Sequence, residues 1–361
     1  GPGQSVRMGV VRGHIADPDL VRKARSGAAA DIRTCLSCNQ ECVGRMGLNR
    51  WLGCIENPRA GREAVVLPLP TRRSQRVLVV GGGPGGLQAA VTAAERGHHV
   101  TLFEKANRLG GQVPVAASVP SRAEFLDITR NLVSAAQRAG VDVKTACEAT
   151  ADLLLAEAPD AVVLATGAVP NRPWWAGELA RVVDVRDVLE GRCAPTGRVL
   201  VVDELGFHQA TSTAELLADR GCYVEIATPG MVVGQDLGIT LDLETWNVKA
   251  DAKGITQTTD VVPMGAAKDG RQLVVSLQHH PTGTDLPRPV EWVVCAIQQR
   301  ADGPLGQSVT GAASRVERVG DCPAPRGGSG AGRGGPGAAG SPGPGSPIPG
   351  ARRASTSWVQ R

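Results

Sequence analysis

The chain has 361 residues, which is enough for about two domains, and its 42% hydrophobic content is ordinary for a protein with a packed core. No run of 18 apolar residues and no charged-then-apolar leader occurs, so we expect neither a membrane partner nor a signal segment. The formal net charge is +4, but five arginines and no acids follow residue 322, and subtracting five leaves −1 for the rest. With only 3% aromatic residues and no basic stripe, the composition argues against nucleic-acid binding.

The first 30 residues carry a strand-like stretch from Val6 to Val11 and then a short basic helix. The nine cysteines of the chain are an odd number, and four of them have metal-ligand spacing. This usage favours a reducing compartment, so we expect a cytoplasmic protein.

Four cysteines within 20 residues form the most informative motif of the chain. They follow the pattern C-x2-C-x3-C-x11-C. Zinc sites usually show two paired C-x2-C knuckles or include histidine, whereas here three thiols crowd one loop and the fourth returns alone. The spacing therefore favours a 4Fe-4S cluster, although it differs from the bacterial ferredoxin run and leaves structural zinc as the alternative. The four candidate ligands are Cys35, Cys38, Cys42 and Cys54.

A β-α-β pattern begins after a Pro-rich linker that ends near residue 70. It predicts a buried strand at Val77–Val80, a helix at Pro84–Arg96 and a second strand at His99–Phe103. The loop between the first strand and the helix matches G-x-G-x-x-G, in which the glycines permit a tight turn, a close approach of pyrophosphate, and close helix–strand packing. An acidic residue then follows the second strand, where it would accept a hydrogen bond from an adenosine ribose. The residues in question are Gly81, Gly83, Gly86 and Glu104.

Helical periodicity continues over residues 121–140, and Asp160–Thr166 has the pattern of another buried strand. A second β-α-β unit spans 198–226, with a helix expected at about 211–220. Its loop contains Asp203 and Glu204 in place of the first glycines, and two acids at a phosphate site would repel the ligand. Residues 231–300 have the pattern of short strands and turns, and Val316–Val319 that of a last strand.

Residues 327–350 are almost entirely Gly, Pro, Ala and Ser. Such a segment cannot bury enough apolar surface to offset the entropy of ordering it, so we expect it to be disordered.

Taken together, these motifs resemble the C-terminal two-thirds of the iron–sulfur NADH:flavin oxidoreductases, the old-yellow-enzyme-like group typified by 2,4-dienoyl-CoA reductase and trimethylamine dehydrogenase. The resemblance covers about residues 6–326. It rests on the cysteine spacing, on Cys54-Ile-Glu-Asn-Pro58, on Glu104-Lys-Ala-Asn-Arg-Leu-Gly-Gly-Gln112, on Leu164-Ala-Thr-Gly-Ala168 and on Gly320-Asp321.

The resemblance implies an α/β fold in which a 4Fe-4S linker is followed by two nested Rossmann-like domains. It implies FAD on the Gly81 loop, with further contacts from Gly111, Gln112, Thr166, Gly167 and Asp321. Arg12 would correspond to the arginine that holds the FMN phosphate at the end of a TIM barrel. The implied divisions are 1–30 (end of the barrel), 31–70 (cluster segment), 71–175 with 296–326 (FAD-type), 176–295 (degenerate NAD(P)-type) and 327–361 (low-complexity tail).

The chain also departs from the family pattern. The FMN barrel that would precede residue 6 is missing, and the tail replaces a closing helix, so we expect a fragment that is not fully active alone. The substrate site would belong to the barrel, and no catalytic residue is identified. The lost glycines at 203–208 put NAD(P)H binding in doubt.

Two other interpretations remain open. One is a fragment of an amine dehydrogenase, a branch that holds ADP in place of FAD and passes electrons to a partner electron-transfer flavoprotein. The other is a non-catalytic nucleotide-binding fragment with a zinc knuckle. The sequence is compatible with a homo-oligomer and does not define the oligomeric state.

Overall fold

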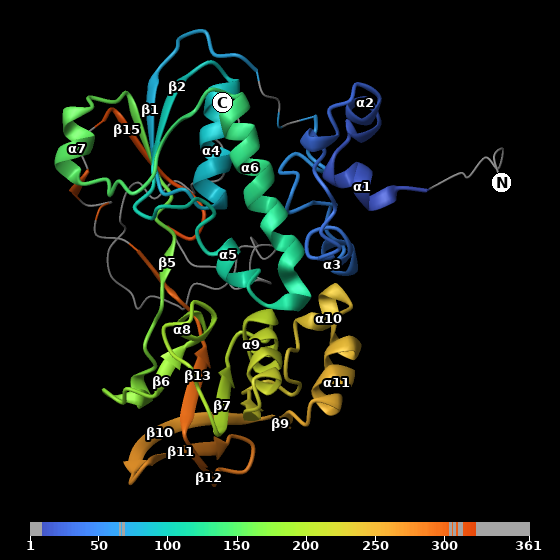
Figure 1. Cartoon of the computed structure of the whole chain (residues 1–361), viewed down its shortest axis with the longest axis vertical. Coiled ribbons are helices and arrows are strands. Elements are labelled where there is room, and N and C mark those ends of the chain that lie inside the picture. Colours follow the sequence, from blue (N-terminus) through green and yellow to red (C-terminus); the bar gives the residue numbers. More distant parts are fainter. Residues whose placement is uncertain are drawn as a thin grey trace, which may run out of the picture.

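The computed structural model describes residues 9–64, 66, 69–302, 305, 308, 309 and 313–322 (Figure 1). The predicted tail at 327–361 lies outside these residues. The described chain forms two α/β units, each built on a five-stranded parallel sheet, and a short N-terminal segment that packs beside them. None of the described helices is both long and apolar enough to cross a membrane.

The first unit contains the parallel sheet in the order β15-β4-β1-β2-β3. Successive side chains of its central strand alternate between two cores: Val77 and Val79 face helices α4 and α6, and Leu78 and Val80 face the other side. This burial on both faces confirms the prediction from the apolar run. The strands are β1 (Arg76–Val80), β2 (His99–Phe103), β3 (Asp142–Lys144), β4 (Ala161–Leu164) and β15 (Arg315–Arg318).

Two helices of this unit, α4 and α6, were predicted, and the short helices α5 and α7 were not. Helix α4 begins with Pro84 at its first position, where the missing N–H has no cost, and the chain turns at Gly97, whose φ is +95°. The periodic stretch at 121–140 forms a 3₁₀ turn, η2, that leads into α6. The bounds are α4 (Pro84–Glu95), α5 (Val113–Ala116), η2 (Pro120–Phe125), α6 (Leu126–Arg138) and α7 (Ala151–Ala156).

The second unit contains the parallel sheet in the order β6-β13-β7-β8-β9. Val199 and Val201 face the helices, whereas Leu200 and Val202 face a three-stranded antiparallel sheet that covers the opposite side. The elements are β6 (Val182–Asp184), α8 (Val185–Leu189), β7 (Arg198–Asp203), α9 (His208–Asp219), β8 (Tyr223–Ala227), β9 (Thr256–Thr258) and β13 (Trp292–Ala296).

The expectation of only short strands and turns over 231–300 is wrong in one place. Helix α11 (Leu243–Ala252) occupies part of this range, after the short helix α10 (Leu237–Thr240). Only Trp246 and Ala250 of α11 are buried, one helical turn apart. So narrow an apolar face gives a weak periodic signal. The antiparallel strands are β10 (Val261–Asp269), β11 (Gln272–His279) and β12 (Thr284–Val290).

Two short strands connect the units. The chain leaves the first unit through β5 (Ala168–Val169), which precedes the 3₁₀ turn η3 (Trp174–Ala176), and it returns through β14 (Arg300–Ala301). The two strands pair antiparallel. The second unit is therefore inserted between β4 and β15 of the first, as the nested arrangement predicts.

The N-terminal segment lies beside α6 and against α10 (Figure 1). The prediction of a strand at Val6–Val11 is wrong for the residues that the structure describes. Residues 9 and 10 form no strand, and Val11 begins a helix. No neighbouring strand offers pairing partners among the described residues, so this stretch makes its hydrogen bonds within one helical turn. The basic helix is confirmed as α2. The elements are α1 (Val11–Ala16), α2 (Leu20–Arg25), η1 (Ala29–Asp31) and α3 (Val43–Gly47).

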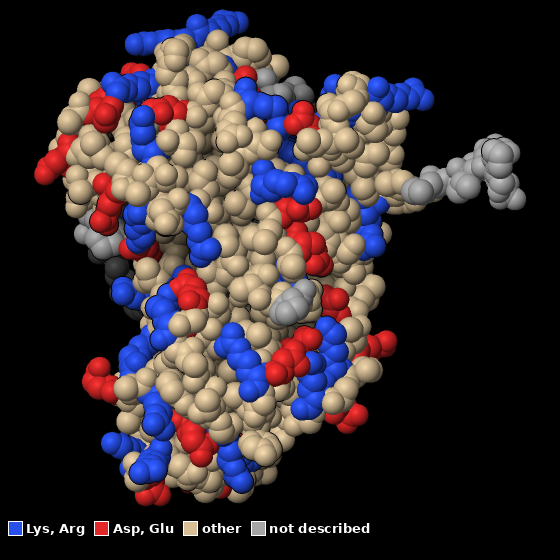
Figure 2. Space-filling view, viewed as in Figure 1, with Lys and Arg blue, Asp and Glu red and all other residues tan. Residues whose placement is uncertain are grey.

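Positive and negative side chains are intermixed over both units on the face that Figure 2 shows.

Candidate functional site

The four predicted ligand cysteines line a single small cavity in the N-terminal segment. The loop that carries the first three is sharply folded, because Ser37 and Asn39 both adopt left-handed backbone conformations (φ +54° and +55°). Residues other than glycine rarely do so, and the cost is tolerated only where the surroundings impose it. One result is that the backbone N–H of Ser37 lies 3.4 Å from the Sγ of Cys35 and donates to it.

The electrostatics of this cavity show that the thiols interact. The pKa of Cys38 is raised to about 11, mainly by burial and to a smaller extent by the nearby thiols of Cys42, Cys54 and Cys35, while the N–H of Gln40 acts in the opposite direction. Burial also raises the pKa of Cys54, against the N–H groups of Glu56 and Asn57. A positively charged metal group would remove this penalty by stabilising the thiolates.

The thiols surround the cavity without meeting at one point. Among the described residues, no three His, Cys, Asp or Glu side chains converge closely enough to hold a single metal ion. A tetrahedral zinc with Zn–S bonds of about 2.3 Å requires all four sulfurs within about 4 Å of one another. A polynuclear cluster is held from its outside by ligands that lie farther apart, and the four thiols line one cavity.

Arg12 lies at this cavity. Its guanidinium donates to Oδ1 of Asn39 at 2.7 Å, and the Nδ2 of Asn39 donates to the carbonyl oxygen of Thr240 at 2.9 Å. The Asn39 side chain thus connects α1, the cysteine loop and the second unit. The expected FMN-phosphate role of Arg12 stays a prediction.

The glycine loop of the first unit is shaped for close backbone contact. Gly81 has a φ of +106°, and a Cβ there would lie 2.3 Å from the carbonyl oxygen of Ala165. A Cβ on Gly86 would lie 1.9 Å from the carbonyl oxygen of Gly81. Gly83 differs, since a Cβ added there would have only one neighbour within 4 Å, the Cα of Gly111. The space in front of the α4 N-terminus is therefore open, as a bound phosphate requires.

Glu104 holds this loop in place. One carboxylate oxygen accepts from the N–H of Gly82 at 2.7 Å, and the other accepts from the N–H of Ala106 at 2.8 Å. The predicted ribose acceptor therefore also has a structural role. A carboxylate can accept about four hydrogen bonds, so acceptor sites remain for a ribose hydroxyl.

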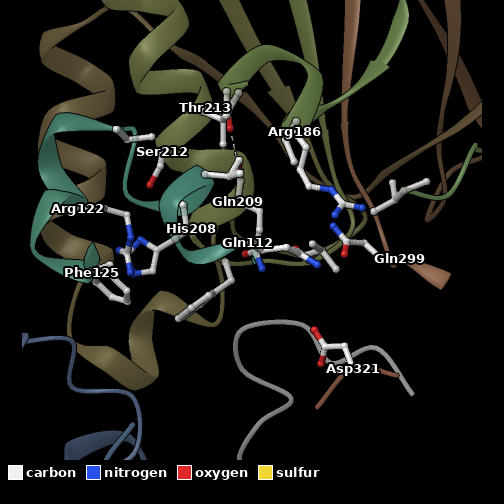
Figure 3. A pocket seen from close by; sticks show the side chains of 18 of the residues that line it. Gln112, Arg122, Phe125, Arg186, His208, Gln209, Ser212, Thr213, Gln299 and Asp321 are labelled. Carbon is white, nitrogen blue, oxygen red and sulfur yellow. Dashed lines mark hydrogen bonds between the residues drawn. The ribbon is translucent and has the colours of Figure 1, made fainter. Parts of the chain in front are cut away.

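A cavity of about 220 Å³ lies between the two units (Figure 3). Gln112 and Asp321, two of the residues expected to contact FAD, line it. The glycines that precede Gln112 and Asp321 pack on the loop. A Cβ on Gly111 would lie 3.0 Å from the Cα of Gly83, and a Cβ on Gly85 would lie 3.3 Å from the Cα of Gly320. Two of the residues that line the cavity therefore directly follow glycines that pack against the loop at the start of α4.

Thr166 and Gly167 follow β4 at the crossing point between the units. The Thr166 hydroxyl donates to the carbonyl oxygen of Asp302 at 2.7 Å, and the carbonyl oxygen of Gly167 accepts from the Asp302 N–H at 3.1 Å. In this structure the two residues fix the start of the connection between the units, and their expected contact with FAD stays a prediction.

The inter-unit cavity and the cysteine cavity share a wall. Gln40, two residues after Cys38, lines the inter-unit cavity, and so does Arg122. Burial lowers the pKa of Arg122, and the negative charges of Asp242 and Cys38 act against this. The Arg122 guanidinium also stacks 4.2 Å above the ring of Phe125. One side chain thus interacts electrostatically with the cysteine loop while it lines the other cavity.

The loop after β7 is closed by its own aspartate. Asp203 is fully buried, and its carboxylate accepts from the N–H groups of Leu205 (3.1 Å), Gly206 (2.8 Å) and Gly234 (3.3 Å). Burial raises its pKa to about 6, against these hydrogen bonds. We expected Asp203 to repel a phosphate by its charge. In the structure it also competes with a phosphate directly, because it accepts the hydrogen bonds of the loop N–H groups of Leu205 and Gly206.

Sequence reasoning missed several residues of the inter-unit cavity, namely Arg122, Arg186, His208 and Gln209. His208 Nε2 lies 3.2 Å from Oδ2 of Asp242, which also accepts from the Thr240 hydroxyl at 2.7 Å. None of these residues belongs to a local motif. Only the packing of the two units brings them together.

The comparisons with known proteins agree with this architecture. The sequence profile described as pyridine nucleotide-disulphide oxidoreductase matches residues 75–202. The chain is 36% identical to N,N-dimethylglycine/sarcosine dehydrogenase of Chromohalobacter salexigens over 82% of its own length and 44% of the relative. It is 35% identical to NADH oxidase of Thermoanaerobacter brockii over 80% and 47%.

A solved structure of 2-naphthoyl-CoA reductase superimposes with a TM-score of 0.81 at 33% identity, covering 89% of this chain and 48% of that one. Histamine dehydrogenase from Rhizobium sp. 4-9 gives a TM-score of 0.81 at 23% identity, which supports the fold alone. The chain spans about half the length of the curated relatives it matches. It belongs to the family of flavin-dependent oxidoreductases that includes these reductases and amine dehydrogenases, and it matches their C-terminal part.

Proposed function

We propose that the chain is the electron-transfer part of a flavin- and iron–sulfur-dependent oxidoreductase. FAD binds along the Gly81 loop, and a 4Fe-4S cluster is held by Cys35, Cys38, Cys42 and Cys54. In a longer protein the cluster exchanges electrons with an FMN barrel. The barrel, the substrate and any partner flavoprotein belong to that longer protein and are part of the proposal.

The wall that the two cavities share is the observation that carries this proposal. Gln40 and Arg122 line the inter-unit cavity, and Gln40 belongs to the cysteine loop while Arg122 interacts electrostatically with Cys38. Two redox groups on either side of that wall would lie close together, as electron transfer requires. FAD and the cluster supply the redox chemistry when bound. The residues of this chain orient them, exclude water, and provide positive charge between them through Arg122.

The chain's own groups fit both cofactors. The strained cysteine loop directs the N–H of Ser37 at a sulfur, and hydrogen bonds to cluster sulfurs are one means by which proteins tune such centres. The open space at Gly83 and the N-terminus of α4 suit a pyrophosphate. The Asp203 carboxylate occupies the N–H groups of Leu205 and Gly206 in the second loop, so we infer that NAD(P)H does not bind there in the usual way.

A second candidate function is an amine dehydrogenase in which ADP occupies the Gly81 loop. It is favoured by the similarity to the C. salexigens dehydrogenase and by the closed Asp203 loop, since such an enzyme does not take electrons from a nicotinamide. A nucleotide extract separates the candidates, because FAD is yellow and ADP is colourless.

The test is an ultraviolet–visible spectrum of anaerobically reconstituted protein, with and without dithionite, together with iron and sulfide analysis. We expect flavin bands and a broad shoulder near about 400 nm that bleaches on reduction. Cys38→Ser should lose iron and sulfide. Cys193→Ser, a half-buried cysteine outside the cavity, is the matched control and should retain them. Full iron and sulfide content in the Cys38 variant would refute the ligand assignment, and one zinc per colourless chain would favour the zinc knuckle.

A further inference from the structure

Arg186 is a charged side chain with unsatisfied hydrogen-bond donors at the inter-unit cavity. It lies in α8, its side chain is 13% exposed, and it lines the cavity. Its Nη1 donates to the carbonyl oxygen of Ala168 at 3.2 Å. Its Nε lies 3.6 Å from Oδ1 of Asp184, which offsets charge but is too long for a hydrogen bond. Neither Nε nor Nη2 has a hydrogen-bond partner.

The same cavity contains an unsatisfied acceptor. Oε1 of Gln209, in the first turn of α9, is buried without a partner. Figure 3 shows the Arg186 guanidinium directed toward Gln299 and Gln112, with Gln209 on the neighbouring wall. Buried donors and acceptors are normally satisfied, and leaving a charged group unpaired is costly. The cavity is therefore shaped for a ligand that carries both acceptors and a donor.

The position of the cavity identifies which part of a ligand would enter it. Glu104 and the end of β2 lie at the adenosine side of the glycine loop, and the loop itself faces the pyrophosphate. Gln112 and Asp321, which line the cavity, are held against Gly83 and Gly85 by the glycines that precede them. Whatever continues beyond the pyrophosphate, away from the adenosine, enters the cavity at these two residues.

ADP and FAD differ in what continues there. ADP ends at its second phosphate, so it would leave Arg186 and Gln209 without partners. FAD continues through a ribityl chain to a ring whose pyrimidine part has two carbonyl groups, a ring nitrogen acceptor and an imide N–H donor. We propose that Arg186 is a specificity-determining residue that selects FAD over ADP by donating to the acceptor groups of the flavin. This inference rests on the proposed nucleotide site at the Gly81 loop.

A nicotinamide ring carried by the second unit is the competing occupant, since its carboxamide also has a donor and an acceptor. The closed Asp203 loop argues against it, because the N–H groups of Leu205 and Gly206, which lie where its pyrophosphate would bind, already donate to the Asp203 carboxylate. The open Gly83 space favours a dinucleotide bound from the first unit.

The experiment measures dissociation constants of FAD and of ADP for the full chain with its cluster reconstituted. The variants are Arg186→Met, Arg186→Lys and, as matched control, Arg192→Gln, an arginine just after α8 that pairs with Asp187 at the surface. We expect Arg186→Met to weaken FAD binding at least 10-fold and to change ADP binding less than 2-fold. Arg186→Lys, which keeps the charge with fewer donors, should show a smaller loss, and Arg192→Gln none.

A second measurement is the reduction potential of bound flavin. Losing a positive charge beside the ring disfavours the reduced form, so the potential should become more negative in Arg186→Met than in the control. If Arg186→Met does not fold, the lysine variant carries the affinity comparison, because it keeps the charge but has fewer donors to offer the flavin.

Three results would overturn the inference: an unchanged FAD affinity, equal losses for FAD and ADP (a structural role only), or, in a parallel titration with NADH, loss of NADH binding with FAD unaffected. Failure of the proposed function would look different. In that case the wild-type chain would bind neither nucleotide, and Arg186 would have no affinity to change.

Discussion

Two alanine substitutions in the glycine loop should separate folding from nucleotide binding. In Gly86→Ala the new Cβ would lie 1.9 Å from the carbonyl oxygen of Gly81, about 1.5 Å short of ordinary van der Waals contact, and also 3.0 Å from the Cβ of Ala165. The obstacle is backbone, which cannot rotate away, so α4 must move off β1. Overpacking of this kind costs about 3 kcal/mol, at the upper end of the usual range. For a unit of this size, that lowers Tm by about 6–12 °C.

Gly83→Ala should behave in the opposite way. Gly83 has a φ of −74°, which alanine adopts readily, and its new Cβ would meet only the Cα of Gly111 at 3.8 Å. The apoprotein should keep its Tm or show a slightly higher one. Alanine lowers the conformational entropy of the unfolded chain, which stabilises the folded state by about 0.4–1 kcal/mol. The added methyl group occupies space in front of α4 that a phosphate needs. We therefore expect FAD affinity to fall about 100-fold, or about 2.7 kcal/mol.

The assay is thermal unfolding of the apoproteins by circular dichroism, with FAD binding followed by flavin fluorescence. The two variants serve as controls for each other, since both place one methyl group on the same loop. The reasoning is refuted if Gly83→Ala binds FAD like the wild type, or if it loses as much stability as Gly86→Ala.

Three further outcomes follow from the site. The pKa of Asp203 is about 6 against an ordinary 3.8, so the folded state holds its proton more tightly. This group's contribution to stability is greatest below pH 4 and falls by about 3 kcal/mol, mainly between about pH 4 and pH 6. Urea unfolding of Asp203→Asn over that range should lack this slope, and an unchanged slope would contradict the assignment. Glu104→Gln should lower the free energy of unfolding by about 1 kcal/mol, because one of the two backbone N–H groups that donate to the carboxylate loses its acceptor. An unaltered urea midpoint would argue against that role. Asn39→Ala should be about 1 kcal/mol less stable than Asn39→Gly, since both lose the side-chain hydrogen bonds but only alanine is strained at a φ of +55°; equal stabilities would mean that the left-handed conformation does not persist.

The first unit could be predicted from the sequence because its signals are local. The strand at 76–80, the glycine loop and the helix that begins at Pro84 each depend on residues within one turn or one strand of each other. The cysteine spacing likewise predicted a common cavity, and the structure gathers all four thiols around one. Helix α11 was missed because its contact with the core is limited to two side chains.

The inter-unit cavity could not be predicted in the same way. Its polar residues come from seven separate places in the chain: the cysteine loop, the residue before α5, η2, α8, α9, the segment after β13 and the turn after β15. No sequence pattern relates Arg122 to Arg186, since they meet only because the second unit folds back over the first. The role of Asp203 also depended on packing, because a carboxylate in a loop motif does not reveal whether it faces a ligand or its own backbone.

The antiparallel pairing of β5 with β14 has a consequence for how this molecule could be taken apart. Ala168 lies opposite Ala301, so the second unit enters and leaves its host at adjacent points, as a guest domain does when it is inserted into a surface loop. Excision of the guest and a short splice across that ribbon would leave the host sheet with every strand neighbour it now has. The host and the guest are therefore separable building blocks, and exchange of the guest is a direct route to chimeras with a different inter-unit cavity.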